Sequence, residues 1–120
     1  MKVAVSALGP SLDDQVDERF GRAKYLLIVE TPAMRVKSID NSENCNAMQG
    51  AGIGTAELVS DNGAEAVITG HLGPKAYQAL SMVDISGYRG TGMTVREAVS
   101  AFEDGTLTEL ESGPSRKGMG

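Results

Sequence analysis

The sequence predicts a single α/β domain built on a five-stranded mixed sheet, with its elements in the order βββαβαβα. Three short apolar runs joined by turn residues fill the first third of the chain, and two further runs alternate with segments of helical spacing. The 120 residues are 41% hydrophobic, which is enough for one continuous core. We therefore assign the domain to residues 1–107 and expect the polar, glycine-rich residues 108–120 to be a disordered tail.

The first three strands are predicted from apolar runs separated by turns. Residues 3–8 form a short apolar run that is typical of a buried strand. Residues 25–29 are apolar at every position, as in a central strand buried on both faces. Residues 34–39 alternate between apolar and polar, which indicates a half-exposed strand at an edge of the sheet. The short links between these runs favour an antiparallel meander.

The remaining elements alternate between helix and strand. Apolar residues recur at helical spacing from about residue 51 to residue 59, and residues 64–69 and 83–88 are predicted strands. Pro74 occupies a position that the first turn of a helix tolerates. Thr94 and Glu97 have the spacing of a capping box at the start of the last helix. This alternation favours parallel pairing with right-handed crossovers, whose loops gather at one end of the sheet, where ligands bind.

Charge and composition argue against several classes of protein. The formal net charge of −5 disfavours nucleic acid as a partner. No stretch approaches the roughly 18 apolar residues of a membrane span, and residues 1–5 lack the pattern of a secretory signal. Cys45 is the single cysteine and cannot form an internal disulfide, so we expect a cytoplasmic location.

Three motifs in order along the chain resemble one known family. Residues 17–23, DERFGRA, resemble the HFGRA loop of the dinitrogenase iron–molybdenum cofactor biosynthesis family, which includes orange-protein-like members. Residues 63–76, GAEAVITGHLGPKA, and residues 94–99, TVREAV, resemble two further segments of that family. The resemblance covers nearly the whole predicted domain. Arg19 stands where many members have histidine before Phe-Gly-Arg, so a histidine ligand is missing at that position.

The resemblance has implications for fold, function and partners. It implies an RNase H-like fold and a non-catalytic role in binding, carrying or assembling a molybdenum–iron–sulfur or molybdenum–copper-sulfide cluster or its precursor. The implied partners are the inorganic anionic cluster itself and cluster-delivery or ATPase proteins. The alternative is a regulatory or protein-interaction domain of the same fold without a cluster, for which the edge strand at residues 34–39 is the expected docking surface.

The candidate site follows from the chemistry of such a cluster. A sulfide-rich cluster is a large, soft anion, which the free amides and partial positive charge of helix N-termini suit. Glycine-bearing loops at residues 47–52, 70–75 and 90–93 precede the three helices, and we expect them to meet at one rim, although ordinary turns share these features. The predicted site residues are Arg19, Gly21, Arg22, Met48, Gly50, Gly52, His71, Gly73, Lys75, Gly92 and Met93.

Two side chains are candidate metal ligands, each with an alternative. Cys45 is the single thiolate and His71 the single imidazole. One cysteine cannot hold a four-thiolate cluster, so Cys45 is either a direct ligand or a bystander. His71 either contacts the ligand or caps a carbonyl group. Met48 and Met93 are soft donors that also serve as packing residues.

Other charged and glycine-rich motifs have alternative interpretations as well. Arg19 either contacts the anion or forms a surface salt bridge with Asp17 or Glu18. The acidic residues between 13 and 18 lack the spacing of a calcium loop and are expected to be solvated. The glycines at 50, 52 and 54 do not form a dinucleotide-binding fingerprint.

Catalysis is not expected. The first and fourth predicted strands carry none of the carboxylates that a two-metal nuclease needs. The single Cys and the single His have no signature that links them as nucleophile and base. We therefore predict a binding protein and no enzyme.

Overall fold

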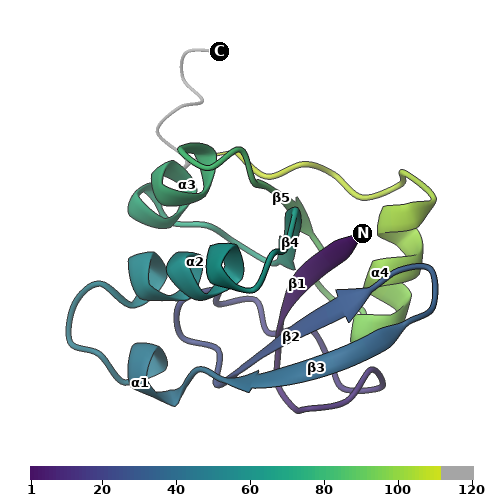
Figure 1. Cartoon of the computed structure of the whole chain (residues 1–120), viewed down its shortest axis with the longest axis horizontal. Helices are drawn as coiled ribbons and strands as arrows, with labels where there is room; N and C mark the ends of the chain where they lie inside the picture. The colour runs from purple at the N-terminus through teal and green to yellow at the C-terminus, as the bar shows by residue number, and fades with distance from the viewer. Residues whose placement is uncertain (112–120) are drawn as a thin grey trace.

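The computed structural model describes residues 1–111 and shows one α/β domain with a single five-stranded sheet (Figure 1). The strands are β1 (Lys2–Ala7), β2 (Tyr25–Glu30), β3 (Arg35–Asp40), β4 (Ala66–Thr69) and β5 (Ser86–Arg89). The helices are α1 (Ser42–Cys45), α2 (Ala51–Asp61), α3 (Pro74–Ser81) and α4 (Val95–Glu103). None of these helices is long and apolar enough to cross a membrane.

The sheet is mixed, with the strand order β3-β2-β1-β4-β5. β1 pairs antiparallel with β2, and β2 pairs antiparallel with β3, as the predicted meander requires. β4 pairs parallel with β1, and β5 pairs parallel with β4, which matches the predicted crossover half. β3 lies at the predicted edge of the sheet, but all but one of its residues are exposed, which is more than the half-exposed strand that its alternating sequence predicts.

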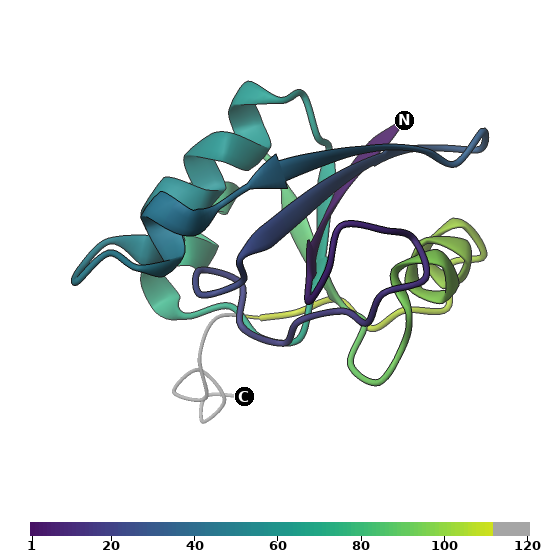
Figure 2. The same cartoon turned by 90° about the horizontal axis from the view of Figure 1, so that it is seen from below.

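Two hydrophobic layers pack on the opposite faces of this sheet. α2 and α3 cover one face and α4 covers the other (Figure 2). Alternation along β1 sends Ala4 into the first layer and Val3 and Val5 into the second, where all three are fully buried. The continuous apolar runs of the central strands therefore follow from burial on both faces.

The start of α4 is set by local sequence. The Thr94 hydroxyl accepts from the Glu97 amide at 3.1 Å, and the Glu97 carboxylate accepts from the Thr94 amide at 3.0 Å. This is the predicted capping box, and it satisfies two of the amides that a helix start leaves without partners.

The largest differences from the predicted elements are at α1 and β5, while β1, β3 and β4 begin within two residues of their predicted starts. No helix is predicted between β3 and α2, yet this segment contains the short helix α1, whose first amide, that of Ser42, donates to the Asp40 carboxylate at 2.8 Å. β5 begins at Ser86, three residues later than predicted, because a turn occupies residues 82–84. In that turn Asp84 has a positive φ of 61°, and the Ile85 amide donates back to the Leu80 carbonyl at 2.9 Å.

The chain continues along β5 after α4. The Arg89 amide donates to the Thr108 carbonyl at 2.9 Å, and the Leu110 amide donates to the Gly87 carbonyl at 2.8 Å. Residues 108–111, which we had placed in the tail, therefore include backbone contacts with the sheet. The rest of the predicted tail, residues 112–120, lies outside the described residues.

Candidate functional site

A cavity of about 680 Å³ opens where the 17–23 loop meets the starts of α2 and α3. Its lining consists of Glu18, Arg19, Phe20, Gly21, Arg22, Ala51, Gly52, His71, Gly73, Pro74, Lys75 and Ala76. His71 follows β4 closely, so the cavity lies at the carboxyl end of a parallel strand, where open α/β sheets commonly hold ligands.

Two helix N-termini contribute unpaired amides to this cavity. The first hydrogen bonds of the two helices join the Gly54 amide to the Gly50 carbonyl and the Tyr77 amide to the Gly73 carbonyl, both at 2.9 Å. Within residues 1–111, the earlier amides of the lining, those of Ala51, Gly52, Lys75 and Ala76, have no protein acceptor. These N–H groups, together with the helix dipoles, favour an anion at this position.

Close backbone packing joins the three segments. A β-carbon on Gly21 would lie 2.7 Å from the amide nitrogen of Gly52, and one on Gly52 would lie 3.0 Å from the β-carbon of Ala76. Gly50, just before α2, has a left-handed φ of 77°, which glycine adopts without strain. The glycines therefore allow the 17–23 loop and the two helix starts to approach one another.

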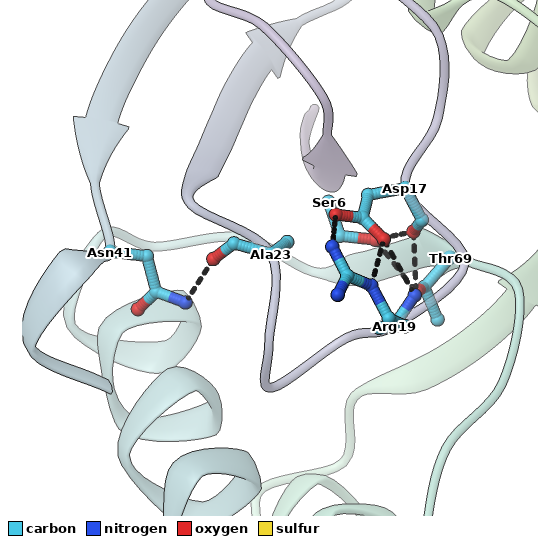
Figure 3. Close-up of polar contacts among 6 residues, drawn as sticks. All are labelled: Ser6, Asp17, Arg19, Ala23, Asn41 and Thr69. Atoms are coloured by element: carbon cyan, nitrogen blue, oxygen red, sulfur yellow. Dashed lines mark hydrogen bonds and ion pairs between the residues drawn. The ribbon is translucent and has the colours of Figure 1, made fainter. Parts of the chain in front are cut away.

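Arg19 is held by a buried carboxylate (Figure 3). Its Nε donates to Asp17 Oδ1 at 3.0 Å and its Nη2 donates to Asp17 Oδ2 at 2.9 Å. Asp17 is 4% exposed, whereas the Arg19 side chain is 65% exposed. The hydrogen bond to Asp17, and then the charge of Asp17, raise the pKa of Arg19 above its ordinary value. The two interpretations of Arg19 are therefore compatible, since it pairs with Asp17 and also lines the cavity.

Polar anchors hold both ends of the 17–23 loop (Figure 3). At its start, the Ser6 hydroxyl donates to the Asp17 carbonyl at 2.6 Å and lies 2.6 Å from the Thr69 hydroxyl. At its end, Asn41 Nδ2 donates to the Ala23 carbonyl at 2.9 Å. Ser6, Thr69 and Asn41 are buried, so these bonds are made away from water and tie the loop to the sheet.

Asn41 also connects the loop to α2. Its Nδ2 lies 3.0 Å from the Thr55 hydroxyl, which donates to the Ala51 carbonyl at 2.8 Å. Asn41 is 1% exposed and Thr55 is fully buried. The end of the loop and the first turn of α2 therefore share one buried hydrogen-bond network.

The remaining charges of the lining have different partners. Arg22 Nη1 donates to the carbonyls of Cys45 and Ala47, at 2.9 Å and 2.6 Å, so it holds the segment that leads into α2. Among the described residues, neither Arg22 nor Lys75 has a carboxylate within 4.0 Å. Glu18 is the one carboxylate of the lining. Three strongly basic side chains thus face the cavity against one exposed acid.

Several predicted site residues lie outside the lining. Met93 packs in the hydrophobic layer under α4, on the other face of the sheet, and Gly92 precedes it there. The expected meeting of three loops is therefore wrong for the loop at residues 90–93, because α4 crosses to the opposite face. Met48 is 94% exposed, and Gly50 is next to the lining without forming part of it.

The predicted metal ligands are not brought together. His71 lines the cavity, whereas Cys45 lies in α1, with its Sγ 3.5 Å from the Ser42 carbonyl oxygen. In residues 1–111 no three His, Cys, Asp or Glu side chains gather into a group that could hold a metal ion. Cys45 and His71 therefore do not form one ligand set in this part of the chain.

Sequence reasoning missed the apolar part of the site. Phe20, Ala51, Pro74 and Ala76 line the cavity together with the cations. Phe20 lies within the DERFGRA motif, so its place between two arginines was an available signal. The salt bridge between Arg19 and Asp17 was one of the two alternatives for Arg19, but the expectation that Asp17 is solvated is wrong, because this carboxylate is 4% exposed.

The chain is similar to known proteins in both sequence and fold. The model of a family described as dinitrogenase iron-molybdenum cofactor matches residues 1–105. An uncharacterized protein of Methanocaldococcus jannaschii is 30% identical over 113 residues, which cover 92% of each chain. The apo form of the orange protein from Desulfovibrio gigas has a TM-score of 0.86 and 40% identity, covering 90% of this chain and 91% of that one. A NifB-like protein from Thermotoga has a TM-score of 0.77 and 31% identity, with the same coverage of 90% and 91%.

Proposed function

The chain belongs to the dinitrogenase iron-molybdenum cofactor family, and from this membership we propose that its cavity binds and carries a preformed metal–sulfur anion without catalysing a reaction on it. The cargo would be a molybdenum–iron–sulfur or molybdenum–copper-sulfide cluster or a thiomolybdate precursor. Cluster-delivery or ATPase proteins would be its donors and acceptors in the cytoplasm. The RNase H-like assignment is part of this proposal, supported by the mixed sheet with its β3-β2-β1-β4-β5 order.

The observation that carries the proposal is the convergence of two helix starts and three basic side chains on one cavity. Unpaired amides and the helix dipoles favour negative charge at that point. Arg19, Arg22 and Lys75 would add charge-assisted hydrogen bonds. Because Asp17 already pairs with Arg19, we expect Arg22 and Lys75 to provide most of the net attraction.

The apolar part of the lining supports a large, soft anion over a small oxyanion. Phe20, Pro74 and the alanines cannot replace the hydrogen bonds that phosphate or molybdate makes with water. A sulfide-rich anion spreads its charge over a larger surface, so removing it from water costs less. The volume of about 680 Å³ also lies within the range of about 300–1,000 Å³ that is usual for ligand sites.

The chemistry of the lining supports carriage over catalysis. Among the described residues, no serine, threonine or cysteine faces the cavity as a nucleophile. The lining contains no cysteine, so no protein thiolate would replace a sulfur atom of the cargo. His71 would serve as a hydrogen-bond donor to a sulfur atom, and the cargo would be released without breaking a bond to the protein.

The proposal is tested by anaerobic titration with tetrathiomolybdate, followed by visible absorbance and calorimetry. We expect binding that weakens at higher salt, and much weaker binding of molybdate and sulfate. Replacing Arg22 and Lys75 together, R22Q/K75Q, removes two cations of the lining and should weaken binding by about tenfold or more. R35Q/R96Q is the control matched in charge, because Arg35 and Arg96 pair with Glu30 and Asp13 outside the lining and should leave binding unchanged.

Two results would contradict the proposal. Equal affinity for tetrathiomolybdate and molybdate would contradict the inference that the apolar part of the lining favours a large, soft anion. Equal effects of R22Q/K75Q and R35Q/R96Q would show that the anion responds to overall charge and does not occupy this cavity.

A further inference from the structure

We propose that the free edge of β3 docks an extended acidic segment of a partner protein, which adds to the sheet as a further strand. This surface lies apart from the cavity, and the two share no lining residue. The inference therefore goes beyond the proposed cargo binding and does not depend on it. Its support comes from the backbone of the edge, the charges beside it, and the symmetry that a second copy would impose.

The backbone of β3 offers hydrogen-bonding groups on its outer side. In residues 1–111, β3 pairs with β2 and with no other strand. The Asn41 amide donates to the Lys24 carbonyl at 2.8 Å, which marks the odd-numbered residues of this strand as those bonded to β2. By alternation, Val36, Ser38 and Asp40 present their N–H and C=O groups outward. At the opposite edge, β5 already has Thr108 and Leu110 as backbone partners.

Three cations lie on one face beside this edge. Lys2, Arg35 and Lys37 line a cleft of about 200 Å³ together with Ile28, Glu30 and Asn62. Arg35 is 3.7 Å from the Glu30 carboxylate in an exposed pair, which contributes little. In the described part of the chain, Lys2 and Lys37 have no carboxylate within 4.0 Å. This cleft is locally basic in a protein whose formal net charge is −5.

Alternation along β3 defines the sequence of the incoming segment. Arg35, Lys37 and Ile39 share the face of the cleft, while Val36, Ser38 and Asp40 share the other face. Cross-strand neighbours in an antiparallel pair lie on the same face. A matching segment therefore places acidic residues beside Arg35 and Lys37, and an apolar residue beside the half-exposed Val36.

A second copy of this chain fits the edge poorly. Two β3 strands that continue one sheet are related by a two-fold axis perpendicular to it, which keeps each residue on its own face. Both copies of Arg35 and Lys37 would then share one face, and β3 has no acid there because Asp40 lies on the other. Like charges on neighbouring strands are destabilising, so a partner with the opposite charge is favoured.

The experiment uses a fluorescein-labelled nine-residue peptide in which glutamate alternates with valine and threonine, and a counterpart with lysine in place of glutamate. We expect the full chain at low salt to bind the glutamate peptide about tenfold more tightly than the lysine peptide. R35Q/K37Q should weaken that binding by about tenfold. S38P removes one outward amide, at an edge position that tolerates proline, and should also weaken it, whereas S38T keeps the amide and should bind normally.

Amide NMR shifts locate the contact and separate it from the cavity. Shifts on adding the glutamate peptide should centre on residues 35–40 and be unchanged in R22Q/K75Q. Shifts centred on the 17–23 loop, or equal binding by S38P and S38T, would overturn the inference. Polyphosphate cannot pair as a strand and should bind S38P and S38T equally, so a glutamate peptide that behaves like polyphosphate would reveal charge attraction without strand pairing. If S38P does not fold, R35Q/K37Q and the shift map decide the question.

Discussion

Gly21 and Gly52 approach so closely that a β-carbon on Gly21 would lie 2.7 Å from the Gly52 amide nitrogen. The contact joins the 17–23 loop to the first turn of α2, and the atoms that a side chain would meet belong to the backbone. A methyl group at residue 21 therefore cannot be accommodated by a rotation of neighbouring side chains.

Gly21→Ala should destabilise the protein and impair anion binding together. We expect the free energy of unfolding to fall by about 1–3 kcal/mol, as for other overpacked sites. Urea unfolding measures the first effect and tetrathiomolybdate titration the second. Gly73→Ser is the control for stability, because a β-carbon there meets nothing within 4 Å and serine suits a helix N-cap. Equal stability of the two variants would contradict the close contact.

Asp17→Asn should release Arg19 from its fixed position. The two carboxylate oxygens accept hydrogen bonds from the Arg19 backbone amide and from its guanidinium. Asparagine has a single side-chain oxygen and cannot replace both acceptors. Because Asp17 is 4% exposed, we expect a loss of about 1–3 kcal/mol in the free energy of unfolding. NMR of the Arg19 Nε–H should show faster exchange with water. An unchanged exchange rate would mean that Asp17 does not hold the side chain.

Asn41→Ala should loosen the 17–23 loop at its far end. The Ala23 carbonyl would lose its donor in a buried environment, at a cost of about 1–3 kcal/mol in the free energy of unfolding. Hydrogen exchange should accelerate in residues 21–24 and in the first turn of α2. Ser38→Ala, on the exposed edge strand, is the control. It should leave the free energy of unfolding within about 0.5 kcal/mol of the parent value and the hydrogen-exchange pattern unchanged. Slower or unaltered exchange near residue 23 in Asn41→Ala would rule out the anchoring role.

The hydrogen bond between Asp40 and Ser42 at the start of α1 should depend on pH. Hydrogen bonds from the Ser42 side chain, and then from the Ser42 amide, lower the pKa of Asp40 below its ordinary value. A lowered pKa in the folded state means that the stabilisation is present above the unfolded value and is lost as the pH falls through the folded value. Carbon-detected NMR should therefore give Asp40 a midpoint below the usual value of about 3.9 for aspartate. In Asp40→Asn the Ser42 amide shift should lose its dependence on acidic pH, and a midpoint at the usual value would refute the bond.

Local signals predicted most of the secondary structure. The uninterrupted apolar run in β2 and the Thr94–Glu97 capping box act over a few residues, so they identify β2 and the start of α4 without knowledge of distant contacts. The start of β5 was misplaced because Val83, although strongly β-forming, lies in a turn and is half-exposed. Its conformation depends on the bond from Ile85 back to Leu80, which hydrophobic pattern does not reveal.

The candidate site was predictable in part. The arginine motif, Gly52 in the first turn of α2 and Gly73 before α3 do line one cavity. Met93 has the same kind of sequence context as these residues, yet it packs under α4 on the opposite face. Phe20 was overlooked because an aromatic residue among charged neighbours signals either core or site, and here it serves both.

By itself, the sequence determined the order of strands and helices apart from α1, the edge position of β3, the N-cap of the last helix and the resemblance to the family, because each depends on neighbouring residues. Tertiary structure alone decided which loops share a cavity. It also decided that Arg19 pairs with a buried Asp17 and still lines this cavity. The physical reason is that the face to which each crossover helix packs, and the burial of a loop carboxylate, depend on the packing of segments distant in the chain.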